Sequence, residues 1–321
     1  MSDTKNRIEW IDFAKGISII LVVYGHSGLS GVPFWGNFFS AIRMPFFFFC
    51  SGLLFRYTKY PQITSLIKRR YGTLVRPFFY FSLMVLLLEY FIQKNWMSYA
   101  ITTLIHGWGG YALWFIPVLF GTELWFYTIC RISKGNQMAM VSMIVISTIL
   151  GYLTYYYNLP NNYNVCFILT SVLFYGVGNL VSPHIINFFK ESAVWKIILA
   201  ACVFFMVTLT FLFNPCKPDF GANFLVGPAT YSAGIGGAFF MCCLAALICK
   251  ISVKPVALIK AAVVFMGKNS YVVLAFHQII LLLLGKYINV PGSIERIIMW
   301  VILVILIKTI NRYFPYILGR K

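Results

Sequence analysis

Three ionisable residues, Asp12, Lys15 and His26, occur in the first apolar run of the chain. Charged and titratable groups are costly inside a bilayer, so each is a candidate for function. Asp12 and Lys15 are three residues apart and would share one helix face, where they can form a salt bridge at the membrane edge. His26 follows Lys15 by eleven residues, about 16 Å along a helix, which is past the middle of a bilayer core. The alternative for His26 is a packed histidine bonded to a carbonyl.

The second apolar run contains Arg43, about five residues from its outer end. A short connection over residues 31–37 makes the two runs antiparallel neighbours, so Arg43 and His26 would lie at similar depth. Arginine keeps its proton and needs a polar or anionic partner there, unless it extends to the outer interface. A neutral histidine beside a fixed cation suits proton abstraction together with stabilisation of developing negative charge.

Composition shows which kind of fold must position these residues. Of 321 residues, 60% are hydrophobic and only 11% are charged, and the mean hydropathy is +0.81. Soluble domains carry about 25% charged residues, so this chain lacks the polar surface of a soluble protein. Its 31 Phe, 20 Tyr and 8 Trp exclude a disordered chain. The apolar runs are continuous, which favours an all-α polytopic membrane bundle over a barrel.

About ten membrane spans are predicted from the apolar runs. They cover residues 11–30, 38–56, 75–92, 111–130, 137–157, 165–182, 194–213, 227–249, 269–285 and 294–313. With the N-terminus inside, 21 of the 26 Lys and Arg residues fall on the inner side and five on the outer side. This asymmetry predicts that both termini are cytoplasmic. The protein is expected to lie in the cytoplasmic (inner) membrane.

The net charge of +18 is explained by these inner loops, so no nucleic-acid partner is expected. The eight Cys include no CxxC pair and predict neither a disulfide framework nor a metal site. Residues 1–321 are expected to form one membrane domain without an appended soluble domain, and the first helix is expected to remain uncleaved. The oligomeric state is left open.

Four blocks of the sequence together resemble the acyltransferase-3 family of multipass membrane O-acyltransferases. They are Arg7…Asp12-x-x-Lys15-Gly16-x5-Val22-x3-His26, Arg43-Met-Pro-x-Phe-Phe-x-x-Ser51-Gly52, Leu113-Trp114-Phe115-Ile116-Pro117 and Gly267-Lys-Asn-Ser270…His277. The resemblance implies transfer of an acetyl group from acetyl-CoA to a sugar hydroxyl of a surface polysaccharide or its lipid-linked precursor, with no bound cofactor. His26 would be the general base and Arg43 would stabilise the oxyanion.

The chain departs from the family pattern at two positions. Lys15 stands where the family often has Arg, which keeps the charge but loses bidentate binding of phosphate or carboxylate. Leu274 stands where a Tyr is frequent, so no hydroxyl acts there. The hydrolase-like domain of longer members is not expected in this chain, and a second, serine-based transfer step is therefore not expected either.

The remaining candidates are assigned to substrate binding. The basic residues among them would attract coenzyme A phosphates, or else anionic membrane lipids. Glu123 is expected to pair with a buried cation or hydroxyl. His277 would share a helix face with Ser270 or pack in the core, and Trp114 would line a cavity mouth or lie at the membrane interface. The full substrate-binding set is Asp12, Lys15, Ser51, Arg69, Arg70, Arg76, Trp114, Glu123, Ser270 and His277.

Two other classes of protein fit the same composition. A transporter or glycan exporter would also need buried charges in a ten-helix bundle. A membrane sensor would carry His26 without needing it for chemistry.

Overall fold

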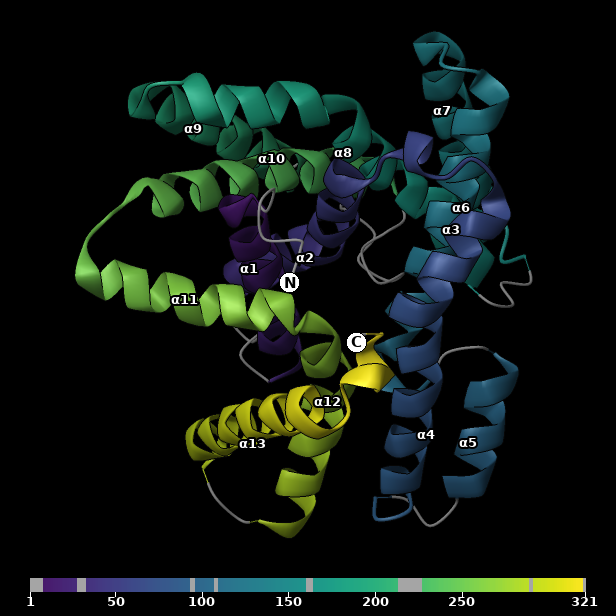
Figure 1. Cartoon of the computed structure of the whole chain (residues 1–321), viewed down its shortest axis with the longest axis vertical. Coiled ribbons are helices and arrows are strands. Elements are labelled where there is room, and N and C mark those ends of the chain that lie inside the picture. Colours follow the sequence, from purple (N-terminus) through teal and green to yellow (C-terminus); the bar gives the residue numbers. More distant parts are fainter. Residues whose placement is uncertain are drawn as a thin grey trace.

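The computed structural model describes residues 8–27, 33–92, 96–106, 109–159, 164–212, 227–288 and 291–319. Within these ranges the chain is helical and has no β-strand (Figure 1). A helix occupies the position of each predicted span. These helices are α1 (Glu9–His26), α2 (Pro33–Leu54), α4 (Arg76–Glu89), α6 (Phe115–Ser133), α7 (Gln137–Tyr156), α8 (Val165–Glu191), α9 (Val194–Leu212), α10 (Pro228–Lys250), α12 (Ser270–Tyr287) and α13 (Gly292–Tyr313).

Within the described residues, seven helical stretches are long and apolar enough to cross a membrane. Helices α1 and α13 each carry at least three charged side chains, which lowers their apolar character. The all-α polytopic membrane fold is therefore confirmed. The number of spans and the side on which each terminus lies stay predictions.

Three further helices lie outside the predicted spans, namely α3 (Ile63–Arg70), α5 (Trp96–Ile105) and α11 (Lys254–Lys268). Helix α3 continues through a π-helical turn over Tyr71–Val75 into α4. The segment that forms α11 lies between the predicted spans 227–249 and 269–285, where no helix is predicted. It is nevertheless a helix that begins with a proline in its first turn, where proline costs no hydrogen bond.

Helix α11 lies directly against α1, between α10 and α12 (Figure 1). The contact depends on glycines. A Cβ atom on Gly16 would lie 2.1 Å from the Val263 carbonyl oxygen, and one on Gly267 would lie 2.3 Å from the Asp12 carbonyl oxygen. Only glycine allows two helix backbones to approach so closely. The contact fixes the part of α1 that carries Asp12 and Lys15.

The C-terminal end of α2 is held by side chains of α8. Asn179 Nδ2 donates to the carbonyl oxygens of Gly52 (3.1 Å) and Phe55 (2.7 Å), and Ser182 Oγ donates to that of Leu53 (2.7 Å). Arg56 Nη1 donates to the carbonyl of Leu53 as well. These bonds satisfy carbonyls that lack a partner at a helix end, and they fix the last turn of α2.

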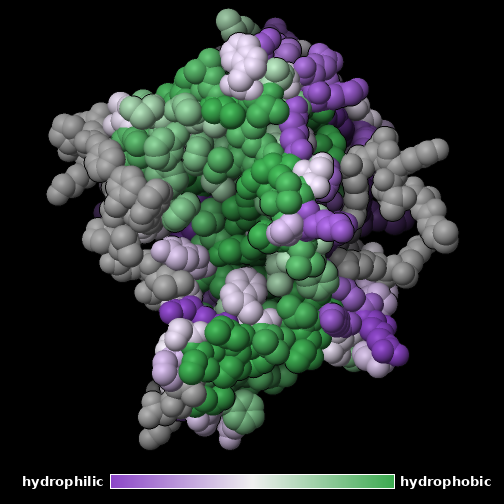
Figure 2. Space-filling view, turned by 90° about the vertical axis from the view of Figure 1, so that its left-hand side faces the viewer, coloured by the Kyte–Doolittle hydropathy of each residue, from purple (hydrophilic) through white to green (hydrophobic). Residues whose placement is uncertain are grey.

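The exterior of the bundle is strongly apolar. Figure 2 shows a broad hydrophobic surface across the centre of the side on which α9, α10 and α11 lie in Figure 1. Exposed side chains on α9 and α13 include Leu199, Met206, Ile297 and Val301. Such a surface is unstable in water and fits contact with lipid tails.

Candidate functional site

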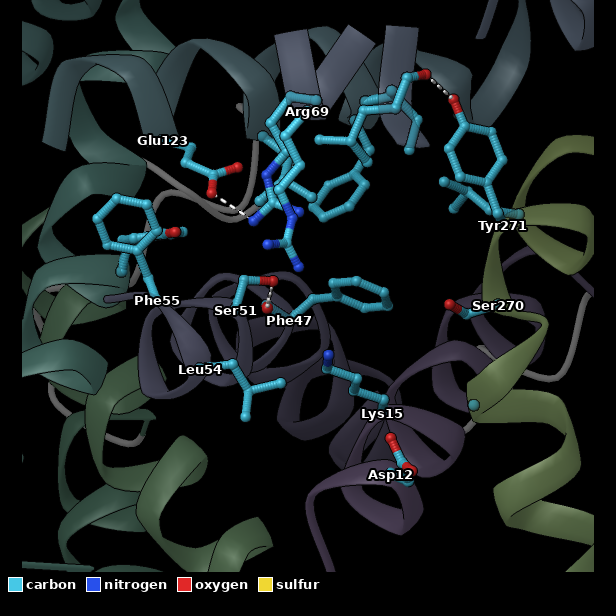
Figure 3. Close-up of a pocket in the computed structure, with 18 of the residues that line it drawn as sticks. Asp12, Lys15, Phe47, Ser51, Leu54, Phe55, Arg69, Glu123, Ser270 and Tyr271 are labelled. Carbon is cyan, nitrogen blue, oxygen red and sulfur yellow. Dashed lines mark hydrogen bonds and ion pairs between the residues drawn. The ribbon is translucent and has the colours of Figure 1, made fainter. Parts of the chain in front are cut away.

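A cavity of about 410 Å³ lies between α1, α2, α3, α6 and α12 (Figure 3). Six basic and two acidic side chains line it, so the cavity carries a net positive charge. They are Lys15, Arg56, Lys59, Arg69, Arg70 and Lys268, with Asp12 and Glu123. We call this space the basic cavity.

Figure 3 shows Lys15 pointing from α1 into the basic cavity, with Arg69 on the opposite wall. Ser51 lies on the floor between them, and its Oγ donates to the Phe47 carbonyl oxygen (3.0 Å). Ser270 lies at the start of α12 on the same cavity. The structure therefore brings together residues from positions 12 to 270 that the sequence assigned to substrate binding.

Glu123 forms an ion pair with Arg70, which confirms the predicted pairing with a cation. Glu123 is buried on α6 and Arg70 reaches it from α3, so the pair joins two walls of the basic cavity. Removal of one partner from such a pair strongly destabilises the folded protein, because the other charge is left buried without compensation. The pair gives the cavity wall a fixed geometry.

Arg76 does not line the basic cavity. Its guanidinium lies over the Tyr316 ring, 4.1 Å from the ring centroid, and donates to the Tyr316 carbonyl oxygen (3.3 Å). This contact joins residues that are 240 positions apart, and no pattern in the sequence indicates it. The structure gives Arg76 a role in holding the C-terminal turn Pro315–Leu318.

A second, smaller cavity of about 40 Å³ lies further along the bundle, at the other end of α1. Its lining combines His26, Arg43 and Trp114 with the apolar side chains of Val22, Met44, Ala112 and Leu274. We call it the histidine cavity. Leu274 lines both cavities and therefore stands between them.

His26 and Arg43 meet as predicted from their depth on neighbouring antiparallel helices. Arg43 passes so close to α1 that a Cβ atom on Gly25 would lie 1.4 Å from Arg43 Nη1. Helix α1 ends at His26, and the predicted end of the span at residue 30 lies outside the described residues. His26 is thus the last residue of its helix, and its side chain is exposed.

His277 is fully buried behind His26, with 5.4 Å between the ring centroids. Its Nδ1 lies 2.9 Å from the Val273 carbonyl oxygen and 3.1 Å from that of Leu274. A carbonyl can only accept, so Nδ1 carries the proton and Nε2 presents its lone pair. That buried Nε2 has no hydrogen-bond partner within the described residues.

Gln278 contacts His26 and was missed by the sequence reasoning. Its side-chain amide nitrogen lies 3.1 Å from His26 Nδ1. A carboxamide can donate from nitrogen or, after rotation, accept at oxygen, so Gln278 can hold the ring of His26 in either tautomer. The only available signal was a polar residue next to His277 in an otherwise apolar run.

Glu89 is a second residue that the sequence reasoning missed. It is fully buried on α4, and its Oε2 accepts a hydrogen bond from the Tyr111 hydroxyl (2.6 Å). Tyr111 has a left-handed backbone with φ of 47°, which is strained for a residue other than glycine. It begins the 3₁₀ turn Tyr111–Trp114, which places Ala112 and Trp114 on the histidine cavity.

Four elements reach both cavities. Each of them contributes residues to the lining of the basic cavity and of the histidine cavity. They are helices α1, α2 and α12 and the segment formed by the 3₁₀ turn Tyr111–Trp114 together with α6. Within the described residues, no group of three or more His, Cys, Asp or Glu side chains is placed to hold a metal ion. The arrangement offers a positive chamber for an anion and, past Leu274, a histidine–arginine pair for group transfer.

These features define a polytopic membrane protein with a basic cavity and, on the other side of Leu274, a histidine–arginine site. Residues 8–310 match the family model Acyl_transf_3, which is described as an acyltransferase domain. The chain therefore belongs to the acyltransferase-3 family and is a membrane acyltransferase. Comparisons with curated proteins and with solved structures gave no match.

Proposed function

We propose that the protein is an O-acetyltransferase that moves an acetyl group from acetyl-CoA to a sugar hydroxyl of a surface polysaccharide or its lipid-linked precursor. The observation that carries this proposal is the arrangement of the two cavities along α1, with Lys15 in the basic cavity and His26 in the histidine cavity. A donor with an anionic head and a long, uncharged arm ending in a thioester fits that arrangement.

The basic cavity would hold the phosphates of the coenzyme. Arginine and lysine bind phosphate through charge-assisted hydrogen bonds. Lys15 and Arg69 face each other across the cavity, and Lys59 and Lys268 lie on its wall. The pantetheine arm would then run past Leu274 toward His26, about 16 Å along α1 from Lys15.

His26 would act as the general base. It takes the proton from the acceptor hydroxyl, whose oxygen attacks the thioester carbonyl carbon. Arg43 stabilises the negative oxygen of the tetrahedral intermediate. The carbon–sulfur bond then breaks, and the coenzyme thiolate recovers the proton from His26. The exposed ring of His26 lets an acceptor approach from outside the bundle, whereas the buried ring of His277 does not.

Membranes that contain the protein should transfer radiolabelled acetyl from acetyl-CoA to the polysaccharide fraction of the cells. His26→Ala should abolish this transfer and still bind acetyl-CoA, because the histidine serves chemistry and lies beyond the basic cavity. Movement of glycan without transfer of label would instead show a transporter. Transfer that survives in His26→Ala would contradict the assignment of the base.

The basic cavity would lie on the cytoplasmic side of the inner membrane, where acetyl-CoA is made. The excess of basic residues in the predicted inner loops supports this orientation. Reporter fusions after Cys130 and Lys254 should then read cytoplasmic, and a fusion after Asn158 should read outside. The reverse labels would put the donor cavity on the wrong side.

A further inference from the structure

The histidine cavity is much smaller than the basic cavity. Its volume is about 40 Å³, a tenth of the 410 Å³ of the basic cavity. An acetyl group has three non-hydrogen atoms, a butyryl group five and a succinyl group seven. The small volume beside His26 and Arg43 therefore favours the shortest of these groups.

The apolar walls of this cavity come from four separate elements. Val22 lies on α1, Met44 on α2, Ala112 on the 3₁₀ turn and Leu274 on α12. Each is at most 7% exposed, and all four belong to one hydrophobic core cluster. Packed cores yield little to an extra methylene group, so these walls resist expansion.

His26 and Arg43 line the same small cavity as these four apolar residues. An acyl group whose carbonyl carbon lies within reach of His26 and Arg43 would therefore have its chain against the apolar walls. Leu274 lines both cavities, so it would meet the acyl group where the donor arm enters.

We propose that Val22, Met44, Ala112 and Leu274 form the pocket that limits the acyl donor to acetyl. This inference rests on the proposed function and adds the determinant of acyl-chain length. One methylene group in an apolar pocket changes a rate ratio by about tenfold or more. Butyryl-CoA should therefore be at least about a hundredfold poorer than acetyl-CoA with the wild-type protein.

The test compares kcat/KM for acetyl-, propionyl-, butyryl- and succinyl-CoA within each membrane preparation. Leu274→Ala and Met44→Ala each remove three non-hydrogen atoms from a wall, which is more than the two atoms that butyryl adds. Either variant should raise the butyryl-to-acetyl ratio at least about tenfold. The ratio is independent of the amount of folded protein, so a loss of stability in a variant does not hide the effect.

Leu284→Ala is the matched control. Leu284 lies on α12 as Leu274 does and is similarly buried, but it lines neither cavity. Its butyryl-to-acetyl ratio should equal that of the wild type. Ala112→Val tests the same wall in the opposite direction, because it fills the cavity and should reduce acetyl transfer without weakening acetyl-CoA binding.

The outcomes separate this inference from the proposed function. A wild-type protein that transfers acetyl and butyryl at equal rates would overturn the inference alone. Unchanged ratios in both Leu274→Ala and Met44→Ala would do the same. Efficient succinyl transfer by the wild type would also overturn it. A wild-type protein that uses no acyl-CoA at all would overturn the proposed function, and the inference with it.

Discussion

Replacement of Gly25 by alanine tests whether Arg43 acts at the position that the structure gives it. The new Cβ atom would lie 1.4 Å from Arg43 Nη1 and 2.7 Å from Cζ. Ordinary contact begins near 3.4 Å, so the guanidinium must move by about 2 Å. The helix itself should tolerate the change, because alanine is favoured over glycine in helices by roughly 0.5–1 kcal/mol.

The expected cost is catalytic. Misplacement of a catalytic group by about 1 Å can lower a rate about a hundredfold, and removal of one oxyanion donor costs about a hundredfold to a thousandfold. Gly25→Ala should therefore lower kcat by about 10²-fold to 10³-fold while protein yield and thermal stability in detergent stay near the wild-type values. Acetyl transfer in membranes at matched expression measures the rate.

Gly285→Ala is the control, because that glycine is also helical and its Cβ would find only Glu295 Oε1 at 3.5 Å. It should leave the rate unchanged. The double variant Gly25→Ala/Arg43→Ala should be no slower than Arg43→Ala alone, since both changes act on one group. A fully active Gly25→Ala protein, or losses that multiply in the double variant, would refute the role given to Arg43.

Three further predictions concern the two cavities. Arg69→Glu should raise the KM for acetyl-CoA, and the increase should be larger at low salt. Lys68→Glu on the same helix should leave the KM unchanged, because Lys68 does not line the basic cavity. Equal increases in the two variants would indicate a general effect of surface charge. His26→Ala should abolish turnover, and adding Arg43→Ala should cost little more, which rates of the single and double variants will decide. Gln278→Leu should lower kcat about tenfold or more without changing the KM for acetyl-CoA. Gln278→Glu should have a higher kcat than Gln278→Leu, because a glutamate can keep a hydrogen bond to His26. An unaltered kcat in Gln278→Leu would exclude a positioning role for Gln278.

Much of the architecture follows from the sequence, because apolar runs and basic loops report directly on membrane spans. The position of His26 and Arg43 on one cavity follows too, since helix rise and span direction convert sequence position into depth. The helical state of α11 could not be predicted from its lysines. These residues mark a cytoplasmic loop as readily as an amphipathic helix that packs on α1.

Other parts of the site depend on contacts that a single sequence does not encode visibly. Arg76 resembles Arg69 and Arg70 in type and neighbourhood, yet it stacks on Tyr316 far along the chain. Glu89 lies near the edge of a predicted span, where an acidic residue commonly faces solvent, but it is buried against Tyr111. In both cases the tertiary partner determines the role of the side chain.

The spacing of the residues along the proposed donor path can nonetheless be recognised in the sequence. On α1, Lys15, Val22 and His26 are separated by seven and four residues, a total of eleven. Eleven residues come within about 20° of three full helical turns, so the three side chains share one face. The structure places Lys15 on the basic cavity and the other two on the histidine cavity.

Helices α2 and α12 repeat this arrangement with shorter spacings. Arg43, Phe47 and Ser51 are four residues apart on α2, and their stripe runs from the histidine cavity to the basic cavity. On α12, Ser270 and Leu274 are four residues apart, and this stripe runs from the basic cavity to the histidine cavity. Three helices therefore each carry one stripe of residues that reaches both cavities.

Because one rigid face of α1 serves both cavities, a rotation of α1 that displaced Lys15 from the donor phosphates would also turn His26 away from the acyl group. Donor binding and chemistry are in this way tied to the same packing contacts, above all the glycine contact between α1 and α11.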